Sequence, residues 1–164
     1  MRTLAVAALV AVDILAASSA LAAGEFTHQG WRGQAAFDDG KFNRCQMWMS
    51  AINNWDLGLT LIHTGELRLG LRNQKLELGW SALFGEKFGL RLQLDDGPVV
   101  SRVFIAANST LLGTTLKDLD WDKRLADARL LRVNTGSRVR LFHLTGIKEA
   151  YGMLRACVAK HKTA

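Results

Sequence analysis

The stretch VRLFHLTGIKEAYGMLRACVAK, residues 139–160, contains the patterns of a strand, a turn and a helix in succession. Its first residues alternate, with Val139, Leu141 and His143 on one face, which is the period of a strand. Thr145-Gly146 is a turn signal. After the turn, apolar side chains recur at the three-and-four spacing that predicts one buried face of a helix. This face consists of Ile147, Ala150, Tyr151, Leu154 and Val158.

The N-terminal residues 1–22 have the layout of a secretory signal peptide. Arg2 precedes an apolar run, and the small residues around Ala22 fit a cleavage site. The run, which Asp13 interrupts, is shorter than the roughly 20 residues that a membrane span needs. We therefore expect a periplasmic or secreted protein that does not span the membrane. Residues 23–164 have the length of a single domain with one core.

The chain has two cysteines, Cys45 and Cys157, and the second lies beside the apolar face of the predicted C-terminal helix. In an exported protein, a disulfide is the leading assignment for such a pair. A redox or metal role would need closer partners, such as a CxxC pair, which the sequence lacks. The bond would attach the C-terminal helix to an early strand and restrict the unfolded chain by about 4 to 5 kcal/mol.

Short alternating segments separated by polar turns fill most of the chain. Asp38-Asp39-Gly40 and Asp95-Asp96-Gly97 have the composition of tight turns between strands. The predicted strands are residues 31–37, 42–52, 57–62, 67–72, 76–79, 89–94, 99–107 and 139–144. Such even spacing indicates an antiparallel meander. We expect a mainly β protein, an antiparallel sandwich or small barrel with one or two helices, the last at the C-terminus.

Residues 117–133 depart from this alternation. Trp121, Leu125 and Ala128 have the spacing of a helical face, which predicts a helix over this range. Its ends would be Asp118 or Asp120 as the N-cap and residues 134–136 as the stop. The alternative is a loop over the acidic start of the segment.

Arginines are the first candidates for a binding surface. The formal net charge is +6 at pH 7, which favours anionic partners, although the same charge also serves solubility. Because arginines alternate with leucines in the predicted strands, we expect a basic face on the sheet. Its members would be Arg68, Arg72, Arg91, Arg102 and Arg140.

Tryptophans are the second candidates, since an indole combines a large apolar area with a hydrogen-bond donor. Of the five tryptophans, Trp48 is predicted opposite the Cys45 face of its strand, and Trp55 lies in a polar turn. Either side chain could stack on a sugar or dock a partner. The alternative is that both tryptophans cover the ends of the sheet.

The sequence contains none of the common catalytic or cofactor-binding motifs. It lacks GxSxG, HExxH and the glycine-rich phosphate loops, so we predict no catalytic residues, no metal site and no cofactor. No motif supports nucleic-acid binding. A small hydrolase that uses His63 with Asp38 or Asp96 is an alternative function. A carrier of apolar ligands, suggested by the many leucines, is another.

Several loose spacings resemble small exported alphaproteobacterial proteins of the invasion-associated locus B group. They are the signal peptide, Cys45-Gln46-Met47, the strand pair around Asp95-Asp96-Gly97, and Leu144-Thr145-Gly146 with Ala150, Leu154 and Cys157-Val158. The resemblance implies a β-rich envelope protein without enzymatic activity. The leading hypothesis rests on export, a single domain, the missing catalytic motifs and the arginines on strand faces. It is a non-enzymatic protein that binds an envelope protein or an anionic lipid or glycolipid through a basic, aromatic surface.

Overall fold

The computed structural model describes residues 25–51, 54–73, 85–117, 119–136 and 138–162. The predicted signal peptide, the predicted strand at 76–79 and the candidate cap Asp118 lie outside the described residues. Within them, ten strands and two helices follow one another. The strands are β1 (Phe26–His28), β2 (Trp31–Asp38), β3 (Lys41–Ser50), β4 (Trp55–Ile62), β5 (Leu67–Asn73), β6 (Lys87–Leu94), β7 (Val100–Asn108), β8 (Leu111–Leu116), β9 (Leu130–Asn134) and β10 (Val139–His143). The helices are α1 (Leu119–Asp127) and α2 (Ile147–Lys162).

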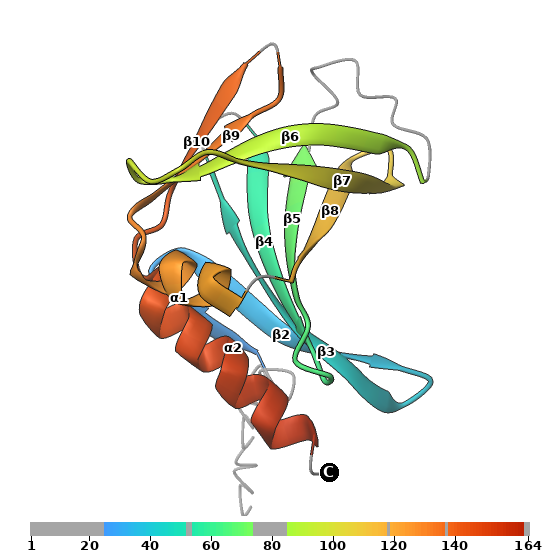
Figure 1. The fold of residues 1–164 in the computed structure, drawn as a ribbon. Coiled ribbons are helices and arrows are strands. Elements are labelled where there is room, and N and C mark those ends of the chain that lie inside the picture. The colour runs from blue at the N-terminus through green and yellow to red at the C-terminus, as the bar shows by residue number, and fades with distance from the viewer. Residues whose placement is uncertain (1–24, 52–53, 74–84, 118, 137, 163–164) are drawn as a thin grey trace, which may run out of the picture.

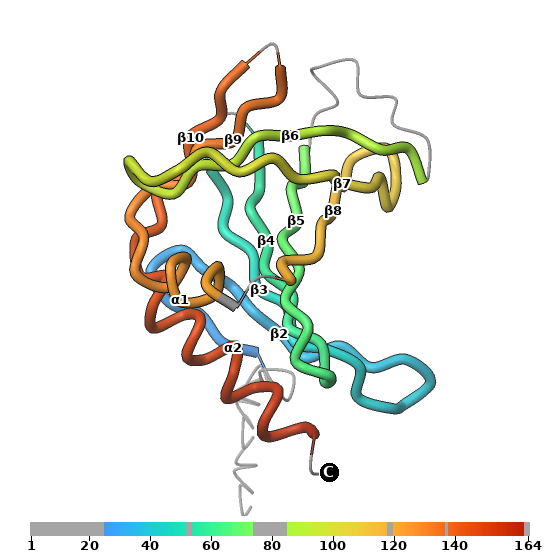
Figure 2. Tube along the Cα trace, in the orientation of Figure 1, coloured from blue at the N-terminus to red at the C-terminus, as the bar shows by residue number. Residues whose placement is uncertain are grey.

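All ten strands belong to one antiparallel sheet in the order β1-β2-β3-β4-β5-β8-β7-β6-β9-β10. The sheet is strongly curved, so that β6 and β7 run across the direction of β4 and β5 (Figure 1). The Cα trace follows the same curve (Figure 2). The predicted mainly β, antiparallel fold with a last helix at the C-terminus is confirmed.

One face of the sheet, here called the inner face, carries the core. Alternate residues of β3 to β5, such as Met47, Leu59 and Leu69, are fully buried on it. Helix α2 packs on β1 to β4 and contacts α1. No helix among the described residues is long and apolar enough to cross a membrane.

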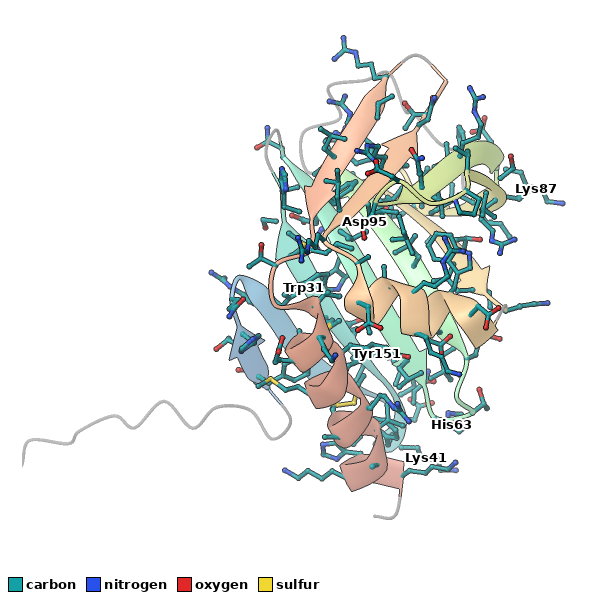
Figure 3. All side chains as sticks on the ribbon, turned by 60° about the vertical axis from the view of Figure 1, so that its left-hand side comes forward. Trp31, Lys41, His63, Lys87, Asp95 and Tyr151 are labelled. Atoms are coloured by element: carbon teal, nitrogen blue, oxygen red, sulfur yellow. A yellow bond between two sulfur atoms is a disulfide. The ribbon has the colours of Figure 1, made fainter. Side chains whose placement is uncertain are left out.

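The predicted disulfide joins α2 to this inner face. Cys45 of β3 and Cys157 of α2 are bonded, across a sequence separation of 112 residues. Figure 3 shows the bond between the helix and the sheet. The apolar helix face predicted from the sequence is buried in full, because Ile147, Ala150, Tyr151, Leu154 and Val158 are all enclosed.

The predicted helix over residues 117–133 is wrong in its second half. The helix ends at Asp127, and β9 follows at Leu130–Asn134. Pairing with β6 on one side and β10 on the other places Leu131 and Val133 in the core. Tertiary pairing therefore overrides the helical spacing at this point. The sequence prediction also missed β8, which pairs with β5 and β7.

The predicted basic face is also wrong in part, because β10 has the opposite orientation. Phe142 is 1% exposed, whereas Val139 and Leu141 are 54% and 51% exposed. Arg140 alternates with Leu141 and therefore lies on the inner face with Phe142. Arg102 likewise pairs with the buried Leu90 on the inner face. Only Arg68, Arg72 and Arg91 keep their predicted place on the opposite face, here called the outer face.

Candidate functional site

Trp48 lies flat on the outer face of the sheet because two glycines leave room for its ring. It pairs with Gly58 of β4, and Gly58 pairs with Gly70 of β5. A Cβ atom at Gly58 would lie 2.3 Å from the Trp48 ring, and one at Gly70 would lie 2.9 Å from it. Any larger residue would therefore lift the indole off the sheet. The Leu-Gly-Leu sequence in both strands keeps the leucines in the core and leaves the outer face bare.

Arg72 lies over the Trp48 ring and is held there by a buried carboxylate. Its Cζ atom is 5.0 Å from the ring centroid, within the range of a cation–π interaction. Its Nε and Nη2 atoms lie 2.7 Å and 2.6 Å from Oδ2 of Asp56. The Asp56 side chain is 1% exposed, and that of Arg72 is 44% exposed. The guanidinium is thus fixed from beneath and open to solvent above.

A cavity of about 810 Å³ opens beside this pair, here called the Trp48 cavity. Its outer-face lining includes Arg32, which pairs with Trp48, and the neighbouring pair Gln34 and Gln46. Arg32 is exposed and has no hydrogen bond or ion pair among the described residues. Glu25 adds one carboxylate to the lining. The cavity therefore combines an aromatic ring, two guanidinium groups and two side-chain amides.

The structure brings only Trp48 and Arg72 together from the predicted binding surface. Arg68 lies on the outer face of β5, but its Nε donates to Oε1 of Glu66 at 2.6 Å. Arg91 of β6 lines a different cavity with Arg132. Since β8 and β7 separate β5 from β6, Arg91 does not extend the basic surface around Arg72.

Trp55 is a core residue of β4, which corrects the prediction that it lies in a polar turn. It begins β4 and is 2% exposed on the inner face. The Cζ atom of Arg140 lies over its ring at 5.4 Å from the centroid. The polar residues before Trp55 suggested a turn, but the alternation Trp55, Leu57, Leu59 continues the buried side of the strand.

The candidate catalytic side chains of the alternative hydrolase do not contact one another. Nδ1 of His63 lies 3.0 Å from the carbonyl oxygen of Asn43, and Nδ2 of Asn43 donates to Asp38. His63 and Asp38 thus share a neighbour without a direct bond in the described part of the chain. Asp96 contacts Arg132, and its neighbour Asp95 lies far from His63 (Figure 3). Among the described residues, no group of three or more potential ligands could hold a metal ion.

The Asp-Asp-Gly segments serve as turns, as predicted. In the first, Asp39 and Gly40 both have positive φ values, of 51° and 76°. In the second, the positive φ falls on Asp95 and not on the glycine. The Asp95 carboxylate accepts hydrogen bonds from the backbone N–H groups of Arg129 and Leu130. The Asp95 carboxylate therefore has a structural role in this turn.

Sequence reasoning missed several residues of the Trp48 cavity. Arg32 and the glutamines belong to strands that were predicted, but their cross-strand register with Trp48 requires the turn geometry. One signal was present in the sequence. The two Leu-Gly-Leu repeats, at Gly58 and Gly70, mark strand positions where another side chain approaches the backbone.

Comparisons with known proteins give no further assignment. No protein-family model matches the sequence, no curated protein matches it, and no solved structure matches it. The resemblance to the invasion-associated locus B group therefore stays a prediction.

Proposed function

We propose that this protein is a non-enzymatic binding protein of the cell envelope, and that the Trp48 cavity binds an anionic saccharide, such as the carbohydrate part of a glycolipid. The observation that carries the proposal is the stack of Arg72 on Trp48 above the buried Asp56. Such an arrangement keeps a guanidinium in one orientation before any ligand arrives, which lowers the entropy lost on binding.

The donors of the site fit an anionic sugar. Asp56 occupies Nε and Nη2 of Arg72, while Nη1 has no hydrogen bond among the described residues. Nη1 and the Arg32 guanidinium are therefore available for a carboxylate or phosphate. The Gln34 and Gln46 amides can bind hydroxyl groups, and the exposed edge of the half-buried indole can make apolar contact with a sugar ring.

The location of the protein forms part of the same proposal. A disulfide persists in oxidising compartments, so the Cys45–Cys157 bond favours a periplasmic or secreted protein. This location agrees with the predicted signal peptide at residues 1–22 and would expose the Trp48 cavity to envelope glycans.

The test is equilibrium binding of the purified protein to oligogalacturonate, with neutral maltooligosaccharides of the same length as controls. We expect binding of the acidic oligosaccharide alone, and weaker binding as the salt concentration rises from about 50 to about 200 mM. Loss of one charge-assisted hydrogen bond in Arg32→Gln should weaken binding about tenfold. Arg68→Gln is the matched control, because Arg68 is already paired with Glu66.

Two results would contradict the proposal. One is equal binding of acidic and neutral oligosaccharides, and the other is equal loss of affinity in Arg32→Gln and Arg68→Gln. Far-ultraviolet circular dichroism of both variants establishes that the sheet is intact.

A further inference from the structure

β10 is an edge of the sheet, because it pairs with β9 and with no other strand among the described residues. An edge strand leaves every second residue with an unpaired N–H and C=O group. Such groups can pair with an extended segment of another chain.

The residues with open backbone groups follow from the pairing pattern. The N–H of Leu144 donates to the carbonyl of Arg129, and the N–H of Thr135 donates to the carbonyl of Arg138. In an antiparallel ladder, hydrogen-bonded pairs recur every second residue, so Arg140 and Phe142 also bond to β9. The backbone groups of Val139, Leu141 and His143 therefore point to the open side.

A groove runs along this open side. All five residues of β10 line a cavity of about 390 Å³, and its opposite wall is the end of the β3–β4 hairpin. That wall consists of Met49, Ser50, Ala51 and Trp55. The groove thus places an apolar wall beside the free backbone groups, which are the two elements of a strand-addition site.

The charge of the groove selects the kind of segment that fits it. None of the described residues that line the groove carries a carboxylate, whereas Arg140 and His143 belong to the lining. The Nε atom of Arg140 is enclosed and has no hydrogen-bond partner among the described residues. Since no ion pair neutralises Arg140 among the described residues, the positive charge at the groove wall favours an acidic ligand.

We infer that the open edge of β10 binds an extended acidic segment of a partner protein, which adds a strand to the sheet beside β10. Its backbone bonds to Val139, Leu141 and His143. Its inward side chains include a carboxylate that pairs with the partly exposed side chain of Arg140. A second copy of this chain fits less well, because the β10 sequence VRLFH contains no acidic residue and would leave Arg140 unpaired.

The first experiment uses a fluorescent heptapeptide, acetyl-Thr-Val-Glu-Val-Glu-Val-Thr-amide, in an anisotropy titration. We expect saturable binding to the wild-type protein and a loss of at least about tenfold when each Glu is replaced by Lys. Two further peptides carry N-methyl groups on alternate backbone nitrogens, each on a different set. Methylation removes donors without changing the side chains. Since only one set of nitrogens faces β10, one of the two methylated peptides should not bind. Equal affinity of the Glu, Lys and methylated peptides would overturn the inference.

Hydrogen exchange gives a second readout at the residues themselves. In the free protein, the N–H groups of Arg140 and Phe142 should exchange slowly, and those of Val139, Leu141 and His143 should exchange fast. The Glu peptide should protect the fast set alone. No change in that set at saturating peptide would contradict strand addition.

The protein variant for this test is Leu141→Pro, which removes one outward N–H group while the β9 ladder keeps its bonds. Leu141→Thr is its matched control, since it changes the side chain and keeps the N–H group. We expect peptide binding by the control alone. A concentration-dependent dimer that Leu141→Pro abolishes would instead identify a second copy as the occupant and overturn the inference of a partner protein.

Discussion

Two tryptophan–arginine pairs lie on opposite faces of the same sheet. On the outer face, Arg72 stacks on Trp48 and bonds the buried Asp56. On the inner face, Arg140 lies over Trp55, and its enclosed Nε atom has no hydrogen-bond partner in the described part of the chain. The two ring-to-guanidinium distances are alike, at 5.0 Å and 5.4 Å.

The difference shows that an aromatic ring positions a guanidinium but does not replace a carboxylate. Arg72 has a counter-charge within the fold, so this pair is stable by itself and presents its remaining donor to solvent. For Arg140, no such counter-charge lies at Nε among the described residues, which leaves an enclosed donor without an acceptor. The outer pair therefore suits recognition of a small anion, and the inner pair suits docking of an acidic segment.

The largest effect is expected from the disulfide, which joins the strand of Trp48 to helix α2. Cys45 lies on β3, the strand of Trp48, and its bond to Cys157 closes a loop of 112 residues. Replacing both cysteines by alanine should lower the free energy of unfolding by about 4 kcal/mol, because the unfolded chain gains conformational freedom. Urea denaturation followed by tryptophan fluorescence measures this. A change below about 1 kcal/mol would contradict the loop-entropy explanation.

The next effect is a difference in stability between variants of Arg72 and Arg140. Arg72→Leu removes the guanidinium that bonds the buried Asp56 carboxylate, which should cost about 2 to 3 kcal/mol after allowance for the exposure of Arg72. Arg140→Leu removes a donor that has no acceptor, so we expect a change within about 1 kcal/mol. Urea denaturation of both variants provides the measurement. Equal destabilisation would show that the two pairs have the same energetics.

A smaller effect tests the contact between the Trp48 ring and the two glycines beneath it, Gly58 and Gly70. Gly58→Ala places a methyl group within 2.3 Å of the indole, so we expect a loss of about 2 kcal/mol and weaker saccharide binding. Gly113→Ala is the matched control. Gly113 pairs with Gly70 in the same row, and its nearest neighbour to an added Cβ is the Leu69 carbonyl oxygen at 3.9 Å. If both variants behaved alike, the close contact with Trp48 would not be the cause.

The smallest effect concerns a polar group of the core that does have its partner. Burial raises the pKa of Tyr151 most, and the charge of Asp122 raises it further. The charge of Arg155 lowers the pKa, and a hydrogen bond to Asp122 raises it, so that the net shift is upward. Because the folded-state pKa lies above the unfolded value of about 10, this stabilisation is complete below pH 10 and is lost as the pH rises through the folded-state pKa. Tyr151→Phe should cost about 1 kcal/mol at neutral pH and less at alkaline pH.

Tyr151 is the only tyrosine in the chain, so its phenolate absorbance reports this pKa directly. A spectrophotometric titration of the folded protein should give a midpoint above that of the protein in denaturant. Identical midpoints would mean that the phenol is not enclosed beside Asp122.

Local spacing and residue composition predicted several parts of the fold correctly. The apolar face of α2, the Cys45–Cys157 bond and the Asp-Asp-Gly turns follow from spacing and composition alone. The orientation of β10 does not, because its alternation is apolar on both faces. Phe142 is buried and Leu141 is exposed only because of how β10 pairs with β9.

The candidate site was predictable to the same limited extent. Alternation from Cys45 placed Trp48 on the outer face, and alternation from the leucines of β5 did the same for Arg72. Their contact depends on the register of β3, β4 and β5 and on the two aligned glycines, which are long-range properties. Trp55 was misplaced because polar neighbours suggested a turn, whereas the strand begins at the tryptophan itself.

The most direct test of the binding proposal follows the indole N–H signals of the two tryptophans in ¹H–¹⁵N correlation spectra while oligogalacturonate is added. We predict that the Trp48 signal shifts and saturates, that the Trp55 signal stays in place, and that Gly58→Ala weakens the response whereas Gly113→Ala does not. Binding of the oligosaccharide with an unchanged Trp48 signal would contradict the assignment of the ligand site to the Trp48 cavity.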